Sequence, residues 1–285
     1  MNHKTLWQLL RRTFDAWDEN EAPRLGAALA FYTTLSLAPL IIIVVAMVAF
    51  FLGHSAAEAE LLAQVESTIG LQGRDVVQEM LRSQRPATGA LASLIGLATL
   101  LFAASGVFGE LRAALNIMWK VRPETQGGLW DLIQQRFFSF GMVLAVGFLL
   151  LISLVISAVL AAVGKFFAEY LPVSEFVLEI INFVVSFAGT AGLFALIFRY
   201  VPARRIAWHP LWIGSAATAL LFSIGKFGIG LYLGKAAIGS AYGAAGSLVV
   251  VIVWVYYSAM IFLFGAQFTH TLDTARGGNA AAAKA

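Results

Sequence analysis

The chain contains no cysteine among its 285 residues, and only 12% of its residues carry a charge. The lack of cysteine excludes disulfides and thiolate metal sites. The low charge is unlike that of soluble proteins, in which about 25% of residues are charged. Because 60% of the residues are hydrophobic, the chain has more apolar surface than a soluble core of this length buries, whereas lipid accepts such surface. This composition predicts a membrane protein.

The common signatures of enzymes are also missing. The four histidines are scattered and lack the i, i+4 spacing of a metal site. The sequence has no phosphate-binding loop of the Gly-x4-Gly-Lys-Ser/Thr type, and no serine in a nucleophile-elbow context. A formal net charge of +3 is too small to indicate nucleic-acid binding. We therefore expect a protein that is not an enzyme, with no cofactor, no metal and no nucleic-acid partner.

Six apolar stretches are each long enough to cross a bilayer. They are residues 26–52, 88–109, 137–164, 176–198, 207–233 and 243–268. They predict an all-α fold, a polytopic bundle of six transmembrane helices that forms one domain over residues 26–272. The Ala-rich residues 273–285 are predicted to be a disordered tail.

Two amphipathic segments flank the first span. In residues 1–25, Leu6, Leu10, Phe14 and Trp17 follow helical spacing, which predicts a helix lying on the membrane surface. A cap packed on the bundle is the alternative for this segment. Residues 53–87 predict two short amphipathic helices outside the membrane, divided at residues 70–73.

The distribution of positive charge predicts the orientation. If the N-terminus is cytoplasmic, most lysines and arginines fall in the inner loops, as the positive-inside rule requires. Six spans then place both termini in the cytoplasm. We expect a multi-pass protein of the bacterial cytoplasmic (inner) membrane.

Lys226 stands out because it lies inside the apolar stretch 213–235. A charged side chain at the bilayer centre costs roughly 2.5–3.5 kcal/mol on insertion scales. A counter-charge, a water-filled cavity or snorkelling to the nearer interface offsets such a cost. Glu179 in the fourth span is expected at a comparable depth, so an ion pair between Glu179 and Lys226 is one alternative and snorkelling is another.

Other polar side chains follow helical faces within the spans. Glu179, Asn182 and Ser186 share a face of the fourth span, while Trp254, Tyr257 and Ser258 lie near the middle of the sixth. With Lys226 they form the candidate residues of a polar intramembrane cavity. Close helix packing is the alternative for the small residues, and core filling is the alternative for the aromatic ones.

Several stretches resemble the YihY/BrkB family of bacterial inner-membrane proteins. They are ALAFYTTLSLAP at residues 28–39, LNIMW at 115–119, RYVP at 199–202 with Arg204 and Arg205, residues 226–232, YG at 242–243, WVY at 254–256 and GAQ at 265–267. The resemblance covers about residues 10–272. It implies six transmembrane helices and a cytoplasmic-membrane location. Some members carry the label ribonuclease BN, and others are linked to serum resistance or to the export of lipopolysaccharide lipid.

These observations lead to one expected function and two alternatives. We expect the protein to transport or flip a lipid-like or amphipathic solute through its polar interior, with membrane lipids as partners. A homo-oligomer remains open. The first alternative is a non-transporting scaffold or envelope-integrity factor. A ribonuclease is least expected, because RNA hydrolysis needs a metal cluster or an acid/base pair facing water, whereas the polar residues here lie within the bilayer.

Overall fold

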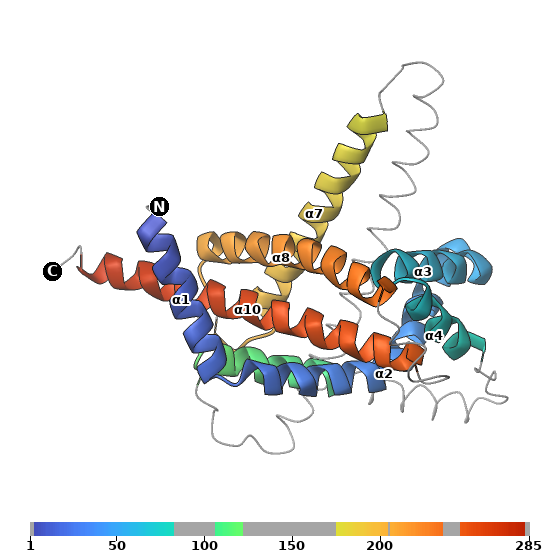
Figure 1. Ribbon diagram of the computed structural model, residues 1–285, viewed down its shortest axis with the longest axis horizontal. Coiled ribbons are helices and arrows are strands. Elements are labelled where there is room, and N and C mark those ends of the chain that lie inside the picture. The colour runs from blue at the N-terminus through green and yellow to red at the C-terminus, as the bar shows by residue number, and fades with distance from the viewer. Residues whose placement is uncertain (1–2, 83–105, 122–174, 205, 236–245, 283–285) are drawn as a thin grey trace.

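The computed structural model describes residues 3–82, 106–121, 175–204, 206–235 and 246–282 (Figure 1). All regular secondary structure in these ranges is helical, as the composition predicts. The helices are α1 (His3–Glu19), α2 (Ala22–Leu52), α3 (His54–Ile69), α4 (Leu71–Arg82), α7 (Glu175–Tyr200), α8 (Trp208–Lys235) and α10 (Gly246–Ala282). Residues 106–118 form a further helix.

Three described helices contain stretches long and apolar enough to cross a membrane, namely Phe183–Tyr200, Trp208–Ile229 and Leu248–Ala275. They fall on the predicted fourth, fifth and sixth spans. The predicted first span is the major part of α2. The predicted third span and most of the second lie outside the described residues, so the count of six spans stays a prediction.

The long helices α2, α8 and α10 run along one common direction (Figure 1). α10 lies between the other two and contacts both. α3 and α4 lie at one end of this bundle, and both chain termini lie at the other (Figure 1). α7 contacts α8 but diverges from it toward the N-terminus of α7 (Figure 1).

Two glycines set the close approach of α8 and α10. A Cβ atom at Gly214 would collide with the Thr269 side chain, and one at Gly265 would collide with Thr218. Each threonine hydroxyl donates a hydrogen bond to the carbonyl of the glycine one turn earlier in its own helix, at 2.7 Å in α8 and 2.8 Å in α10. A Gly-x3-Thr pattern on each helix therefore packs against the same pattern on the other.

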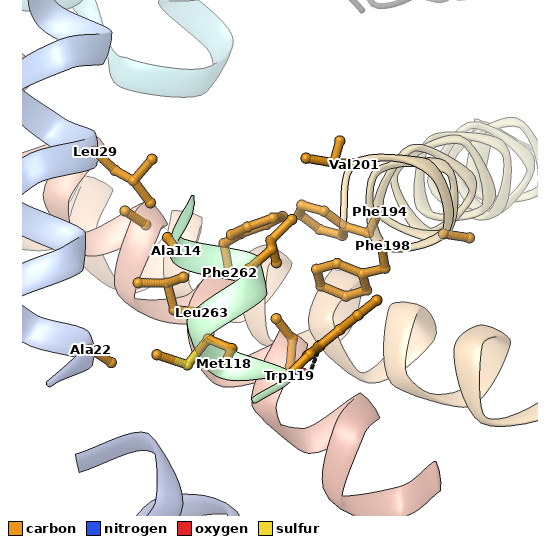
Figure 2. Close-up of a cluster of buried hydrophobic side chains, with 14 of the residues drawn as sticks. Ala22, Leu29, Ala114, Met118, Trp119, Phe194, Phe198, Val201, Phe262 and Leu263 are labelled. Atoms are coloured by element: carbon orange, nitrogen blue, oxygen red, sulfur yellow. Dashed lines mark hydrogen bonds between the residues drawn. The ribbon is translucent and has the colours of Figure 1, made fainter. Parts of the chain in front are cut away.

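Phenylalanine rings form the core where α7, α8 and α10 meet. Phe194 and Phe198 of α7 stack with centroids 6.2 Å apart, and Phe262 of α10 contacts both of them. Figure 2 shows these rings beside Trp119 and Leu263. The apolar face of residues 106–118 completes the cluster through Ala114, Leu115 and Met118.

α10 continues past the predicted sixth span, through the Gly277–Gly278 pair, to Ala282. The division of the chain into a transmembrane domain up to residue 272 and a disordered tail from residue 273 stays a prediction.

Candidate functional site

The Lys226 site, defined here as Lys226, Trp254 and Tyr257, lies on the α8–α10 hairpin. The contacts of Gly214 with Thr269 and of Gly265 with Thr218 fix an antiparallel register between the two helices. Extended along both helices, that register places Lys226 at the level of Tyr257. A Cβ atom at Gly225 would lie 3.2 Å from the Tyr257 hydroxyl oxygen, which confirms that Tyr257 reaches the backbone next to Lys226.

Trp254 lies one turn before Tyr257 on α10 and packs onto α8. Its ring makes an edge-to-face contact with Phe222, with centroids 6.2 Å apart. Phe222 is one turn before Lys226 on α8, so Trp254 packs onto the face of α8 that carries Lys226. The indole Nε1 of Trp254 is buried and has no hydrogen-bond partner among the described residues.

Lys226 itself is half-buried. Within the described part of the chain, no carboxylate lies within ion-pair distance of its ammonium group. The side chains of Glu179 and Asn182 lie outside the described residues, so the predicted pair of Glu179 and Lys226 stays a prediction.

The course of α7 bears on that pair. α7 meets α8 where the rings of Phe194 and Phe222 lie 5.8 Å apart. Glu179 lies about four turns, or roughly 22 Å along the helix axis, before Phe194. α7 diverges from α8 in this direction (Figure 1), and the pair of Glu179 and Lys226 stays a prediction.

The remaining predicted residues lie on two helices. Ser186 is exposed on α7, and its carbonyl accepts a hydrogen bond from the Thr190 hydroxyl at 2.9 Å. Ser258 is half-buried on α10, one turn after Trp254. The structure thus brings Lys226, Trp254 and Tyr257 together, while a cavity that joins them to Asn182 and Ser186 stays a prediction.

A second group of polar residues lies at the end of the bundle where the termini meet. We call it the terminal cluster and define it as Asn20, Asn116, Trp119, Arg199 and Gln267. Asn20 donates a hydrogen bond to the Gln267 side chain at 3.1 Å, and the Trp119 indole donates to the Ala266 carbonyl at 3.1 Å. Gln267 is only 2% exposed and Trp119 is fully buried. These bonds tie α1 and residues 106–121 to α10.

The loop between α7 and α8 is fixed by two members of the terminal cluster. The Asn116 side chain accepts a hydrogen bond from the Ala203 amide at 3.0 Å. The Arg199 guanidinium donates to the Ile206 carbonyl and lies 4.9 Å from the centre of the Trp208 ring. The loop is therefore held by partners on two helical segments, residues 106–118 and α7.

Lys120 ends the helix of residues 106–118 in a left-handed backbone conformation with φ of 51°. The Lys120 amide donates to the Ile117 carbonyl at 3.0 Å, and the Val121 amide donates to the Asn116 carbonyl at 2.9 Å. This pair of bonds is a Schellman motif, in which glycine usually occupies the left-handed position. The turn places Trp119 against α10 at the cost of a strained lysine.

Charged side chains surround the terminal cluster in loose pairs. Lys120 and Glu19 are 3.7 Å apart, and Arg204 and Asp273 are 4.0 Å apart. Such exposed pairs contribute about 0–1 kcal/mol. No group of three histidine, cysteine or acidic residues able to hold a metal occurs in the described ranges.

The sequence prediction did not single out the terminal cluster as a structural unit. Gln267 gave a usable signal, because an amide near the end of an apolar span requires a buried partner. The partners themselves, Asn20 and Trp119, are distant in sequence and became apparent only in the fold.

Comparison with known proteins decides the family. The family described as "Virulence factor BrkB" matches residues 13–285. The chain belongs to the BrkB family. The segments that suggested it include residues 115–119, 199–202 and 265–267, which meet in the terminal cluster.

Individual BrkB-family relatives are named only as membrane proteins. A UPF0761 membrane protein of Alteromonas mediterranea is 29% identical over 87% of this chain and 81% of its own length. Those of Ralstonia nicotianae and Rhodospirillum centenum are 27% and 24% identical. They align with 91% and 95% of this chain, which spans only 57% and 58% of their lengths. No solved structure matches the chain significantly.

Proposed function

We propose that this membrane protein moves or flips a lipid-like, amphipathic solute, and that the Lys226 site contacts the polar part of that solute. One observation carries the proposal. A half-buried lysine lies in a helix apolar enough to cross a membrane, and no described carboxylate neutralises it. A charge retained at such a position is a functional-site hypothesis by default.

A flipping assay tests this proposal. The protein is reconstituted into liposomes that contain phosphatidic acid labelled with a nitrobenzoxadiazole (NBD) fluorophore on one acyl chain, and dithionite is added outside. Flipping exposes the inner-leaflet label, so wild type should bleach more fluorescence than empty liposomes. Equal bleaching with and without protein, repeated with labelled phosphatidylcholine and phosphatidylethanolamine, would count against lipid flipping.

A non-transporting scaffold is the second candidate, and the terminal cluster favours it. Its polar side chains bind one another or backbone groups, and these bonds tie the end of α1 and residues 106–121 to α10 and residues 106–118 to the loop after α7. A scaffold requires this cluster but does not require Lys226. Loss of envelope integrity on disruption of the terminal cluster, with a Lys226→Met protein fully active, would support the scaffold.

The position of α1 supports an interfacial location for the N-terminal segment. α1 crosses the direction of α8 and α10 (Figure 1) and packs through Leu9 onto Phe268 and Leu272. Phe268 is the last residue of the predicted sixth span. The side chains of Leu6, Trp7, Leu10 and Phe14 stay exposed, which suits a helix lying between lipid and water.

The proposed orientation places both termini in the cytoplasm and α3 and α4 outside it. The two termini do lie at one end of the described bundle, opposite α3 and α4 (Figure 1). Reporter fusions after Arg276 should therefore behave as cytoplasmic, and fusions near Gln72 as extracytoplasmic. A cytoplasmic result at Gln72 would reverse the orientation.

A further inference from the structure

The Lys226 site is composed of hydrogen-bond donors. The ammonium group of Lys226 and the indole N–H of Trp254 donate and cannot accept, while the hydroxyl of Tyr257 can donate as well. The buried indole N–H of Trp254 has no hydrogen-bond partner among the described residues, and no described carboxylate forms an ion pair with Lys226. Lys226 and Tyr257 therefore lie at one level of the α8–α10 pair and Trp254 lies one turn away, and no described group neutralises Lys226 or accepts a hydrogen bond from Trp254.

Unmatched donors of this kind are costly. The buried Trp254 indole has lost its water without gaining a hydrogen bond, and the half-buried Lys226 ammonium lacks a counter-charge, whereas Tyr257 is 39% exposed. Water would satisfy the donors equally well but would not neutralise the lysine. An anion with several oxygen atoms both accepts hydrogen bonds and carries the opposite charge.

The surroundings of Lys226 on α8 are apolar. Ile224 and Phe227 lie close to Lys226 in sequence, and their side chains are 62% and 72% exposed. Leu220, earlier in the same helix, is 51% exposed. These side chains project from a helix that is apolar enough to cross a membrane. A ligand that contacts both Lys226 and this surface must combine an anionic group with hydrocarbon.

We propose that the Lys226 site binds the phosphate group of an anionic amphiphile, with Lys226 as counter-charge and with Trp254 and Tyr257 as donors to the phosphate oxygens. A phosphate group has more acceptor oxygens than a carboxylate, which suits donors arriving from two helices. This assignment rests on the proposed function and specifies the solute.

Lipid retention by the purified, full-length protein tests the assignment. Native mass spectrometry compares dioleoylphosphatidic acid with dioleoylglycerol, which has the same acyl chains and no phosphate. Wild type should retain the phosphate lipid at least about tenfold better, because only that lipid can form a charge-assisted hydrogen bond with Lys226. Equal retention of the two lipids would overturn the site.

Substitutions at Lys226 and Trp254 test whether the retained lipid binds at the Lys226 site. Lys226→Met should lose about tenfold in retention, whereas Lys226→Arg should keep most of it. Trp254→Phe keeps the ring, removes the donor and should weaken retention severalfold, while Trp212→Phe, at an exposed position of α8, serves as the matched control. A Lys226→Met protein that melts normally and retains the lipid like wild type would contradict the proposal.

Further arms separate the alternatives. Competition by inorganic phosphate at the same concentration as the lipid would keep the phosphate site but assign it to a soluble ion. Retention that is lost in Lys226→Met but is unaffected by the phosphate group of the lipid, in wild type and in Glu179→Gln alike, would overturn the site as an anion receptor. Binding without flipping would overturn only transport, whereas flipping of phosphatidylcholine that persists in Lys226→Met would overturn only the phosphate site.

Discussion

The terminal cluster and the Lys226 site differ in whether their indole groups have hydrogen-bond partners within the described part of the chain. In the terminal cluster, the indole of Trp119 and the amide of Gln267 find partners within the chain. At the Lys226 site, the indole of Trp254 has none among the described residues. A polar group that is matched within the chain stabilises the fold, whereas a buried unmatched group destabilises it and calls for a functional explanation.

The comparison predicts that substitutions in the terminal cluster reduce stability, and that substitutions at the Lys226 site reduce function. Melting temperature and lipid flipping, measured on the same variants, separate these effects. Four predictions follow in order of decreasing effect on stability.

Trp119→Ala should have the largest effect. It removes a fully buried ring and the bond to the Ala266 carbonyl, so it should cost about 3–5 kcal/mol. Trp212→Ala is the control, since Trp212 is 50% exposed on α8. Unfolding by denaturant or heat measures the stability of both variants. A similar loss of stability in the two would mean that the buried Trp119 stabilises the fold no more than the exposed Trp212.

Gly265→Ala should separate α10 from α8. The added methyl group collides with the Thr218 side chain, and such overpacking costs about 1–3 kcal/mol. Gly228→Ala on α8 has open space around it and should be neutral or slightly stabilising. A Gly265→Ala protein that melts like Gly228→Ala would contradict the close helix contact.

Lys120→Gly should stabilise the protein slightly. The left-handed conformation of Lys120 costs a residue with a side chain about 1–2 kcal/mol, which glycine avoids. The substitution also removes the exposed pair with Glu19, so Glu19→Gln, which removes the pair alone, is the reference. Lys120→Gly should melt above Glu19→Gln, and a lower melting temperature would mean that Lys120 makes a stabilising contact through its side chain.

The sequence predicted the helical class and the location of the last three spans, because long apolar stretches admit few other structures in lipid. It also identified Lys226, since one charge in an apolar stretch is visible without a fold. The partners of Trp119 and Gln267 could not be predicted, because they depend on which helix ends meet. The expected proximity of Glu179 and Lys226 rested on two neighbouring spans that run in opposite directions, and it stays a prediction because the Glu179 side chain lies outside the described residues.

Lys226→Met should have the smallest effect on stability, within about 0.5 kcal/mol of wild type or slightly stabilising, because it replaces an unpaired charge with an apolar side chain of similar length. Its flipping of NBD-labelled phosphatidic acid tests the central claim most directly. We predict that Lys226→Met has a normal melting temperature and flips no more lipid than empty liposomes. The Lys226→Arg variant should flip like wild type, and adding Glu179→Gln to Lys226→Met should not restore flipping. Normal flipping, or a large fall in melting temperature that Glu179→Gln reverses, would contradict the account and assign Lys226 to the fold.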